Sequence, residues 1–306
     1  MTVIDKLNRA KGPLFTFELL PPLKGHSIER VYNTIESLLE FEPAYINFTS
    51  HRNEVQFIEN PDGTLEKRTS RVRPGTIALA AAVKYKYNIT VVPHILCGGF
   101  TREETENALI EMNFLGIEDV FALRGDPPKG SRSFIPERDG NENAGALVEQ
   151  ISAMGRGEYL NGRVESNSAA KFCIGVAGYP EKHFEAPNME IDLQNLKSKV
   201  DAGAHYIATQ MFFDNAAFFR FRDNCRKAGI DVPIIAGIKP ISALNDIKLL
   251  PQTFHIDLPA DLYNAVQICR QVNMESLWQQ HIDLPADLYN AVLKCKTDEE
   301  AREVGI

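Results

Sequence analysis

Short apolar runs recur along the chain, and each run stops at a glycine, a proline or a polar residue. Runs bounded in this way are typical of buried strands. Seven of them predict strands at residues 14–20, 44–50, 89–97, 120–123, 171–180, 206–214 and 232–238. The fifth run contains Gly175 and Gly178, which indicate close approach of a ligand or of another backbone.

Between these runs, apolar residues recur with the spacing of amphipathic helices. The helices are expected at residues 27–40, 76–87, 101–115, 144–154, 192–202 and 216–228. Ser27 is the expected N-cap of the first helix, and Thr101 begins a capping-box sequence. Strands and helices that alternate at intervals of roughly forty residues predict an α/β fold, the (β/α)8 TIM-type barrel. Because only seven strands are recognisable, we expect a barrel that is incomplete at its C-terminal end, with an unpaired edge.

Three stretches do not follow this alternation. Residues 51–75 are polar and without periodicity, which predicts a long loop, and the Gly- and Ser-containing residues 155–169 predict a surface insertion. Residues 255–266 recur identically as residues 281–292. A solenoid needs at least three repeats, so we interpret this pair as a local duplication. We expect one barrel domain over residues 1–306, with an aberrant tail over residues 255–306 that contains the duplicated segment.

Composition narrows the function classes. The formal net charge of -8 and the lack of a long basic run argue against a nucleic-acid partner or an anionic membrane surface. No apolar stretch is long enough to span a bilayer, and residues 1–13 lack the apolar core of a secretory signal. The 5 cysteines are dispersed without CxxC spacing, which favours reduced thiols in a cytoplasmic protein. A homo-oligomer is left open.

Polar side chains stand where the apolar runs end, and barrels bind their ligands at those ends. Glu18 lies within an apolar run, where burial raises the pKa of a carboxyl group, and we favour a functional role over pairing with a neighbouring cation. Arg124 and Asp126 follow the fourth run, and His183, which alone would be an ordinary loop histidine, follows the fifth. A helix stripe that would ordinarily face solvent adds three more polar residues, Asp192, Asn195 and Lys199. Such a ring suits a large anionic or hydrogen-bonding cofactor.

Other kinds of site lack their sequence signatures. The chain contains no GxGxxG after a strand, no GxxxxGK[ST] loop and no GxSxG elbow. His94 and Cys97 form an isolated HxxC, to which Glu18 or Asp126 would have to be added, so we expect no metal site.

Seven segments, in the right order and at sensible spacing, resemble methylenetetrahydrofolate reductase of the bacterial, single-domain kind, from about residue 14 to residue 252. They are residues 16–22, 93–97, 123–126, 177–183, 192–204, 209–214 and 237–241. The resemblance implies a single flavin-binding barrel that holds FAD non-covalently and takes hydride from NADH or NADPH. It implies reduction of 5,10-methylenetetrahydrofolate to 5-methyltetrahydrofolate, in one-carbon metabolism and methionine biosynthesis.

The resemblance also assigns roles to residues. Glu18, Asp126 and Gln210 are the expected folate-facing set, in which Glu18 acts as general acid and Asp126 tunes the flavin. Asn143 stands where the family often has a tyrosine beside the adenosine part of the flavin, and Asp246 stands where a substrate-loop glutamine is common. The expected flavin contacts are Thr49, His94, Arg124, Gly125, Asp126, Ala177, Tyr179, His183, Asp192, Asn195 and Lys199.

Two alternatives stay open. The family's final strand and helix are expected beyond Ile306, and the duplicated segment takes up that length instead. The first alternative is therefore a truncated barrel of the same ancestry that is catalytically impaired or inactive. The second is a flavin barrel like proline dehydrogenase, which shares the cofactor and the architecture.

Overall fold

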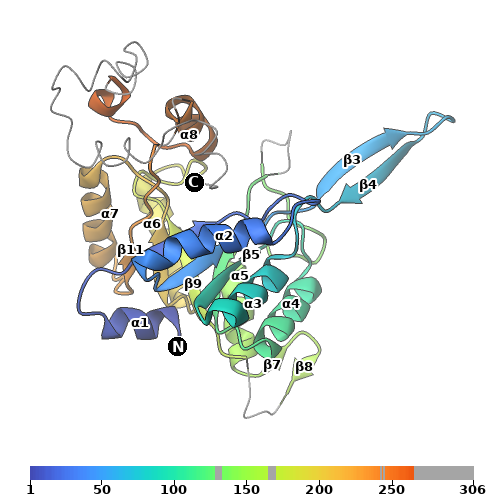
Figure 1. Ribbon diagram of the computed structural model, residues 1–306, viewed down its shortest axis with the longest axis horizontal. Coiled ribbons are helices and arrows are strands. Elements are labelled where there is room, and N and C mark those ends of the chain that lie inside the picture. The colour runs from blue at the N-terminus through green and yellow to red at the C-terminus, as the bar shows by residue number, and fades with distance from the viewer. Residues whose placement is uncertain (128–132, 165–169, 242, 244, 265–306) are drawn as a thin grey trace. The chain divides into compact units, whose positions relative to one another are not determined.

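The computed structural model describes residues 1–127, 133–164, 170–241, 243 and 245–264. Seven strands form one sheet in which spatial order follows chain order. Figure 1 draws the strands as arrows coloured along the chain. They are β1 (Thr16–Leu19), β2 (Tyr45–Phe48), β5 (Thr90–Leu96), β6 (Asp119–Leu123), β9 (Cys173–Gly178), β10 (Tyr206–Thr209) and β11 (Ile234–Ile235). The helices that alternate with them are α2 (Glu29–Leu38), α3 (Thr76–Tyr87), α4 (Arg102–Phe114), α5 (Ala144–Gly155), α6 (Met189–Asp201) and α7 (Asn215–Lys227).

Parallel strands that alternate with helices in this order form an incomplete (β/α)8 barrel, so the predicted fold class is confirmed. The strands formed where apolar residues are consecutive, because a parallel strand is covered on both faces. In β5, six of the seven residues are buried. No helix in the described part of the chain is both long and apolar enough to cross a membrane.

The chain divides into two compact units, and each is described by itself. Unit 1 contains Met1–Val176 and Ser198–Tyr206, and unit 2 contains Ala177–Lys197 and the residues from Ile207 onward. The prediction of a single domain over residues 1–306 stays a prediction.

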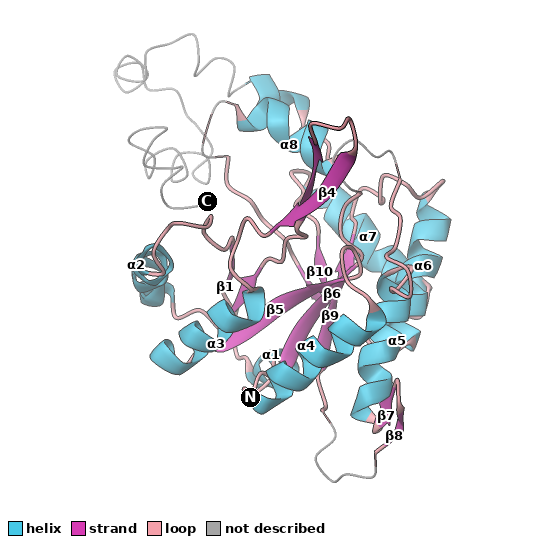
Figure 2. Cartoon of the chain, turned by 90° about the vertical axis from the view of Figure 1, so that its right-hand side faces the viewer, coloured by secondary structure: helices cyan, strands magenta, loops and turns pink. Residues whose placement is uncertain are grey.

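In unit 1 the strand register places the carboxyl ends of four parallel strands at the same end of the sheet. Leu19 pairs with Phe48, Phe48 pairs with Pro93, and Leu96 pairs with Leu123. Helix α3 packs along β5, and α5 packs along β6 (Figure 2). The segments that follow β1, β2, β5 and β6 therefore all begin at this end of the sheet.

The two strand glycines make room for side chains rather than for a ligand or a backbone. In unit 1, a Cβ on Gly175 would lie 2.3 Å from Cζ of Tyr206 and 2.6 Å from Cδ2 of Phe121. In unit 2, a Cβ on Gly178 would lie 2.7 Å from a methyl carbon of Ile207 and 2.8 Å from Cζ of Phe221. The expectation of a ligand or backbone at these glycines is wrong, because core rings and an isoleucine fill the space.

At the amino ends of the strands, unit 1 contains a helix that the sequence patterns did not predict, α1 (Val3–Arg9). Thr2 and Asp5 form a capping box at its start. The backbone N–H of Val3 donates to Oδ1 of Asp119 over 2.8 Å, and Asp119 is buried. Burial raises the pKa of Asp119 to about 6, although the N–H of Val3 acts to lower it.

The predicted loop at residues 51–75 is wrong in its centre. Strands β3 (Glu54–Glu59) and β4 (Leu65–Ser70) form an antiparallel hairpin of six residue pairs that extends away from the sheet (Figure 1). The predicted insertion at 155–169 contains a second short hairpin, β7 (Glu158–Tyr159) with β8 (Gly162–Arg163). Neither hairpin joins the barrel sheet.

In unit 2, strand β11 pairs with β10 through only two residues, Ile234 and Ile235. The chain beyond β11 is held by a side chain instead, because Oγ1 of Thr209 accepts from the N–H of Gly237 over 2.9 Å. A Cβ at Gly237 would lie 2.1 Å from the carbonyl oxygen of Thr209, so glycine is required there. Helix α8 (Asp246–Phe254) follows, and the second copy of the repeat, residues 281–292, lies outside the described residues.

Candidate active site

The residues predicted to form the site fall into two groups, one in each unit. All except those on α6 lie within or just after a barrel strand, as the strand-end pattern predicts. Unit 1 contains Glu18, Thr49, His94, Arg124, Gly125, Asp126 and Lys199. Unit 2 contains Ala177, Tyr179, His183, Asp192, Asn195 and Gln210.

Glu18 and His94 are brought together from β1 and β5. Oε2 of Glu18 lies 3.5 Å from Nε2 of His94, and the His94 side chain is 5% exposed. The ring of Phe121 covers the imidazole, with ring centroids 5.0 Å apart. Nε2 of His94 has no hydrogen-bond partner among the described residues, so a buried polar atom points to the carboxyl group without a full bond to it.

The surroundings shift the pKa of each of these groups toward its uncharged form. Burial, and to a smaller extent the positive charge of a protonated His51, lower the pKa of His94 to about 3. His94 is therefore a neutral imidazole near pH 7. Burial raises the pKa of Glu18, although 57% of its side-chain surface is exposed. Loss of hydration favours the protonated form of a carboxyl group.

The segment after β2 extends the unit 1 group. Oγ1 of Thr49 lies 3.2 Å from Nε2 of His51, and the N–H of Thr49 donates to the carbonyl of Leu19 over 3.1 Å. Burial lowers the pKa of His51, Arg73 lowers it further, and the negative charge of Asp126 raises it. Asp126 and His51 are thus near enough to interact electrostatically, which couples the predicted Asp126 to a histidine that was not predicted.

A third element of the unit 1 group is cationic and aromatic. The guanidinium of Arg124 lies 5.0 Å from the centroid of the Phe134 ring. Nη2 of Arg52 is 3.7 Å from Oε1 of Glu137, while Nη1 of Arg52 is buried without a hydrogen-bond partner in the described structure. His51, Arg52 and Phe134 were missed because they lie in polar segments without apolar periodicity.

Gly125 is the turn that separates Arg124 from Asp126. Its φ is +85°, in the left-handed region that favours glycine. The carbonyl of Arg124 accepts from the N–H of Gly98 over 2.9 Å, so the chain turns immediately after a bond to the neighbouring strand end. The positions of Arg124 and Asp126 therefore depend on the backbone turn at Gly125.

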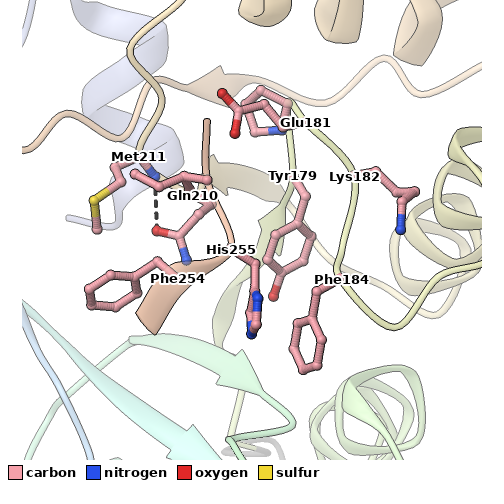
Figure 3. A pocket seen from close by; sticks show the side chains of 10 residues that line it. Tyr179, Glu181, Lys182, Phe184, Gln210, Met211, Phe254 and His255 are labelled. Atoms are coloured by element: carbon pink, nitrogen blue, oxygen red, sulfur yellow. Dashed lines mark hydrogen bonds between the residues drawn. The ribbon is translucent and has the colours of Figure 1, made fainter. Parts of the chain in front are cut away.

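In unit 2 a row of rings follows β9. The Tyr179 ring meets His183 edge-on at 4.7 Å, and His183 stacks on Phe184 at 4.8 Å. Phe184 in turn stacks on His255 at 4.3 Å (Figure 3). The N–H of His183 donates to Oδ2 of Asp192 over 3.0 Å, which ties this loop to α6. Asp192 is therefore a structural support of His183, and His255 is a neighbour that the sequence did not indicate.

Gln210 follows β10 and is fixed at both ends. Its backbone N–H donates to the carbonyl of Gly178 over 2.8 Å, and its Oε1 accepts from the N–H of Met211 over 2.9 Å (Figure 3). Because Oε1 is engaged, the amide NH2 is the group of the Gln210 side chain that can donate to a ligand.

Helix α6 and the start of α5 complete the comparison with the predicted residues. Asn195 is exposed, and Asp192 and Lys199 are half-buried, on the shared face that their spacing predicts. Asn143 is the N-cap of α5, where its Oδ1 accepts from the N–H of Ala146 over 3.0 Å. Asn143, which caps α5, therefore stands where the resemblance expects a tyrosine.

No set of three metal-ligating side chains is found among the residues that the structure describes.

Sequence comparison assigns the chain to a family. A family profile described as methylenetetrahydrofolate reductase matches residues 3–276. The chain is 33% identical over 245 residues to 5,10-methylenetetrahydrofolate reductase of Salmonella typhimurium, covering 80% of this chain and 70% of that protein. It is 30% identical over 279 residues to methylenetetrahydrofolate reductase (NADH) 1 of Arabidopsis thaliana, covering 87% of this chain and 42% of that protein.

Structure comparison agrees on the fold. A protein from Clostridium thermocellum, described as binding two copies of 5-methyl-5,6,7,8-tetrahydrofolic acid, matches with a TM-score of 0.54 and 15% identity. The match covers 99% of this chain and 96% of that one. At this identity the likeness concerns the fold alone. Together with the profile, which spans most of the chain, these findings show that the chain belongs to the methylenetetrahydrofolate reductase family.

Proposed function

We propose that this protein binds FAD non-covalently and reduces 5,10-methylenetetrahydrofolate to 5-methyltetrahydrofolate, with NADH or NADPH as hydride donor. Family membership supports the reaction, and relatives are named for it. The observation that carries the proposal is the pair of Glu18 and His94, a carboxyl group with a raised pKa beside a buried neutral imidazole.

The residues present fit a large cofactor with phosphate and ring-nitrogen groups. Nε2 of His94 and Nη1 of Arg52 are buried polar atoms without hydrogen-bond partners among the described residues, and buried groups of this kind mark places where a ligand completes the bonding. The residues proposed to hold FAD are Thr49, His94, Arg124, Gly125, Asp126, Ala177, Tyr179, His183, Asp192, Asn195 and Lys199. When bound, FAD accepts a hydride from the nicotinamide and supplies it to the folate.

Glu18 is the proposed general acid. Opening of the methylene bridge to an iminium leaves a ring nitrogen that needs a proton. A carboxyl group can hold that proton near neutral pH only if its pKa is raised, and burial raises the pKa of Glu18. The neutral His94 beside it adds no positive charge, so it does not work against the protonated form.

Asp126 and Gln210 are proposed to contact the folate. A carboxylate at Asp126 opposes negative charge that develops on a reduced flavin ring and so tunes the cofactor. Gln210 presents its amide NH2, because its Oε1 is engaged by Met211, and it can bond the pterin edge without adding charge.

The proposal is tested with the purified 306-residue chain. We expect a yellow protein, or a colourless one that becomes yellow after incubation with FAD and gel filtration. Anaerobic NADH or NADPH should bleach the flavin, and methylenetetrahydrofolate should restore its absorbance. Failure to take up FAD would contradict the proposal and favour an inactive barrel of the same ancestry. Reoxidation by a cyclic imine instead of the folate would favour a flavin barrel like proline dehydrogenase.

A further inference from the structure

Unit 2 holds residues 255–257, the start of the first copy of the repeated sequence, against a surface that consists of Glu181 and Phe184. We call it the repeat-docking surface. The N–H of Asp257 donates to Oε2 of Glu181 over 2.8 Å. The His255 ring stacks on Phe184, with centroids 4.3 Å apart and planes inclined by 23° (Figure 3). Ile256, between these two contacts, is 5% exposed. Three successive residues thus supply a ring, a buried aliphatic side chain and a backbone donor.

The three groups that contact or cover the repeat-docking surface, from His255, Ile256 and Asp257, all belong to the repeated twelve residues. The second copy, residues 281–292, offers the same ring, aliphatic side chain and backbone N–H at His281, Ile282 and Asp283. The copies first differ one residue earlier, where Phe254 precedes the first copy and Gln280 precedes the second. Phe254 lines the same pocket as His255 and Ile256, so this difference favours the first copy.

We propose that the repeat-docking surface is a binding site for the His-Ile-Asp segment, and that residues 281–292 of the same chain exchange with residues 255–266 as its occupant. The inference does not rest on the proposed catalytic function. It follows from the chemical identity of the two copies, since a surface that binds one copy binds the other by the same contacts.

Chain connectivity decides which copy dominates. The first copy directly follows α8, where His255 is the C-cap with φ of +53° and its N–H donates to the carbonyl of Pro251. Docking of the second copy would leave a loop of residues 255–280 between α8 and the site. Closing a loop of this length disfavours the second copy on the order of 100-fold. The loop spans up to about 85 Å when extended, so it does not prevent docking.

Exchange within one chain is favoured over exchange between chains. A tethered segment has an effective concentration in the millimolar range, whereas a second molecule is present at the micromolar concentration of a purified sample. The second copy is therefore a minor occupant in the unmodified protein. It becomes the main occupant when the first copy is weakened.

The test uses a disulfide reporter in a Cys269→Ser, Cys295→Ser background. One reporter pairs Glu181→Cys with Asp257→Cys, and the other pairs Glu181→Cys with Asp283→Cys. Each is equilibrated in a glutathione redox buffer, and the linked peptides are identified by mass spectrometry. We expect the 181–257 bond to predominate. We expect Ile256→Asp to increase the 181–283 bond at least 10-fold, because a buried carboxylate disfavours the first copy.

The matched control is the same substitution in the second copy. Adding Ile282→Asp to Ile256→Asp should abolish the gain, and Ile282→Asp alone should leave the 181–257 bond unchanged. The linked product should run as a monomer. No gain after Ile256→Asp, a gain that survives Ile282→Asp, or linkage only between two chains would each overturn the proposal.

A second measurement avoids the cysteines and the loss of the Glu181 acceptor. Trp278 is the single tryptophan of the chain and lies three residues before His281. Docking of the second copy restrains it, so Ile256→Asp should raise its fluorescence anisotropy, and the double Ile256→Asp, Ile282→Asp variant should return it to the starting value. Unchanged anisotropy in a variant with native circular dichroism would contradict the exchange.

Discussion

Burial in the barrel sheet shifts the pKa values of Glu18 and His94. Their reactive atoms are 3.5 Å apart, and burial shifts the pKa of the acid upward and that of the base downward. Each shift favours the uncharged form of its group. The two shifts therefore oppose an ion pair between Glu18 and His94.

Replacement of Glu18 tests its role in proton transfer. In Glu18→Gln we expect reduction of FAD by NADH to persist, and reoxidation by methylenetetrahydrofolate to slow on the order of 100- to 10,000-fold, because the amide cannot donate a proton as an acid. Stopped-flow absorbance of the two half-reactions measures this. Glu29→Gln, at an exposed position on α2, is the control and should change neither rate. Equal loss of both half-reactions in Glu18→Gln would mean that Glu18 is structural.

Replacement of His94 tests the burial of a neutral imidazole. The folded pKa of His94 is about 3, below the ordinary value of 6.5, so the unfolded chain takes up a proton that the folded chain does not. The stability from this group is present above pH 6.5 and is lost as pH falls toward 3. Between pH 7 and pH 5 the loss is about 2 kcal/mol. Urea unfolding of His94→Gln should show a pH dependence weaker by that amount, and identical dependence in the two proteins would contradict it.

At the scale of elements, the turn after β6 depends on one backbone conformation. Gly125 has φ of +85°, and a Cβ there would be 3.8 Å from Leu96, so Gly125→Ala is limited by backbone strain and not by space. We expect a loss of about 1 kcal/mol in unfolding free energy and weaker FAD binding, because Arg124 and Asp126 flank the turn. Urea unfolding and FAD titration measure the two effects. Gly12→Ala, with open space around its Cβ position, is the control.

Helix α1 is tied to the core through a buried acceptor, Asp119. In Asp119→Ala the N–H of Val3 loses its partner, and we expect a loss of about 1–3 kcal/mol and faster hydrogen exchange in residues 3–9. Asp119→Asn keeps an oxygen acceptor and should retain the protection. Retained protection in both variants would mean that α1 is held by other contacts.

Asp119 also carries a pH dependence of its own. Its folded pKa of about 6 lies above the ordinary value of 3.8, so its contribution to stability is complete below pH 3.8 and is lost as pH rises to 6. In Asp119→Asn this loss should be absent when unfolding free energy is compared between pH 4 and pH 6.5.

At the scale of the whole molecule, the thiols report the integrity of the core. Cys97, Cys173 and Cys225 are buried, and burial raises the pKa values of Cys97 and Cys173 to about 12 and of Cys225 to about 11. Since the thiolate is the reactive form, native protein treated with iodoacetamide at pH 8 should remain unmodified at these three positions. In guanidinium chloride all 5 cysteines should react. Peptide mass mapping distinguishes the two states, and native modification of Cys97 would contradict the prediction.

Sequence periodicity located the seven strands and the six helices between them, because a parallel barrel buries both faces of its strands and one face of its helices. Helix α1 escaped because it has seven residues and buries only Val3. The β3–β4 hairpin escaped because it packs on no core, as Phe57 and Leu65 show with 65% and 66% exposure. Strand β11 is shorter than predicted because the N–H of Gly237 donates to the side chain of Thr209 instead of forming a backbone bond to β10.

The candidate site was predictable where strand ends place residues. Glu18, His94 and the segment Arg124–Asp126 lie within or just after strands, and the register of unit 1 places the carboxyl ends of their strands at the same end of the sheet. His51, Arg52 and Phe134 were not predictable, because contacts within a long polar segment leave no periodic signal. His255 was recognised only as part of a duplication, since its stacking on Phe184 joins segments that are far apart in sequence.

The β3–β4 hairpin also has a practical use. Glu54 and Ser70 are paired residues at its base, so the hairpin begins and ends at points about 5 Å apart. A short turn could therefore bridge this gap in place of the whole excursion, and a fluorophore or an affinity tag could be carried at the tip near Asp62 and Gly63. The hairpin gives the molecule a handle for immobilisation that lies outside its barrel sheet.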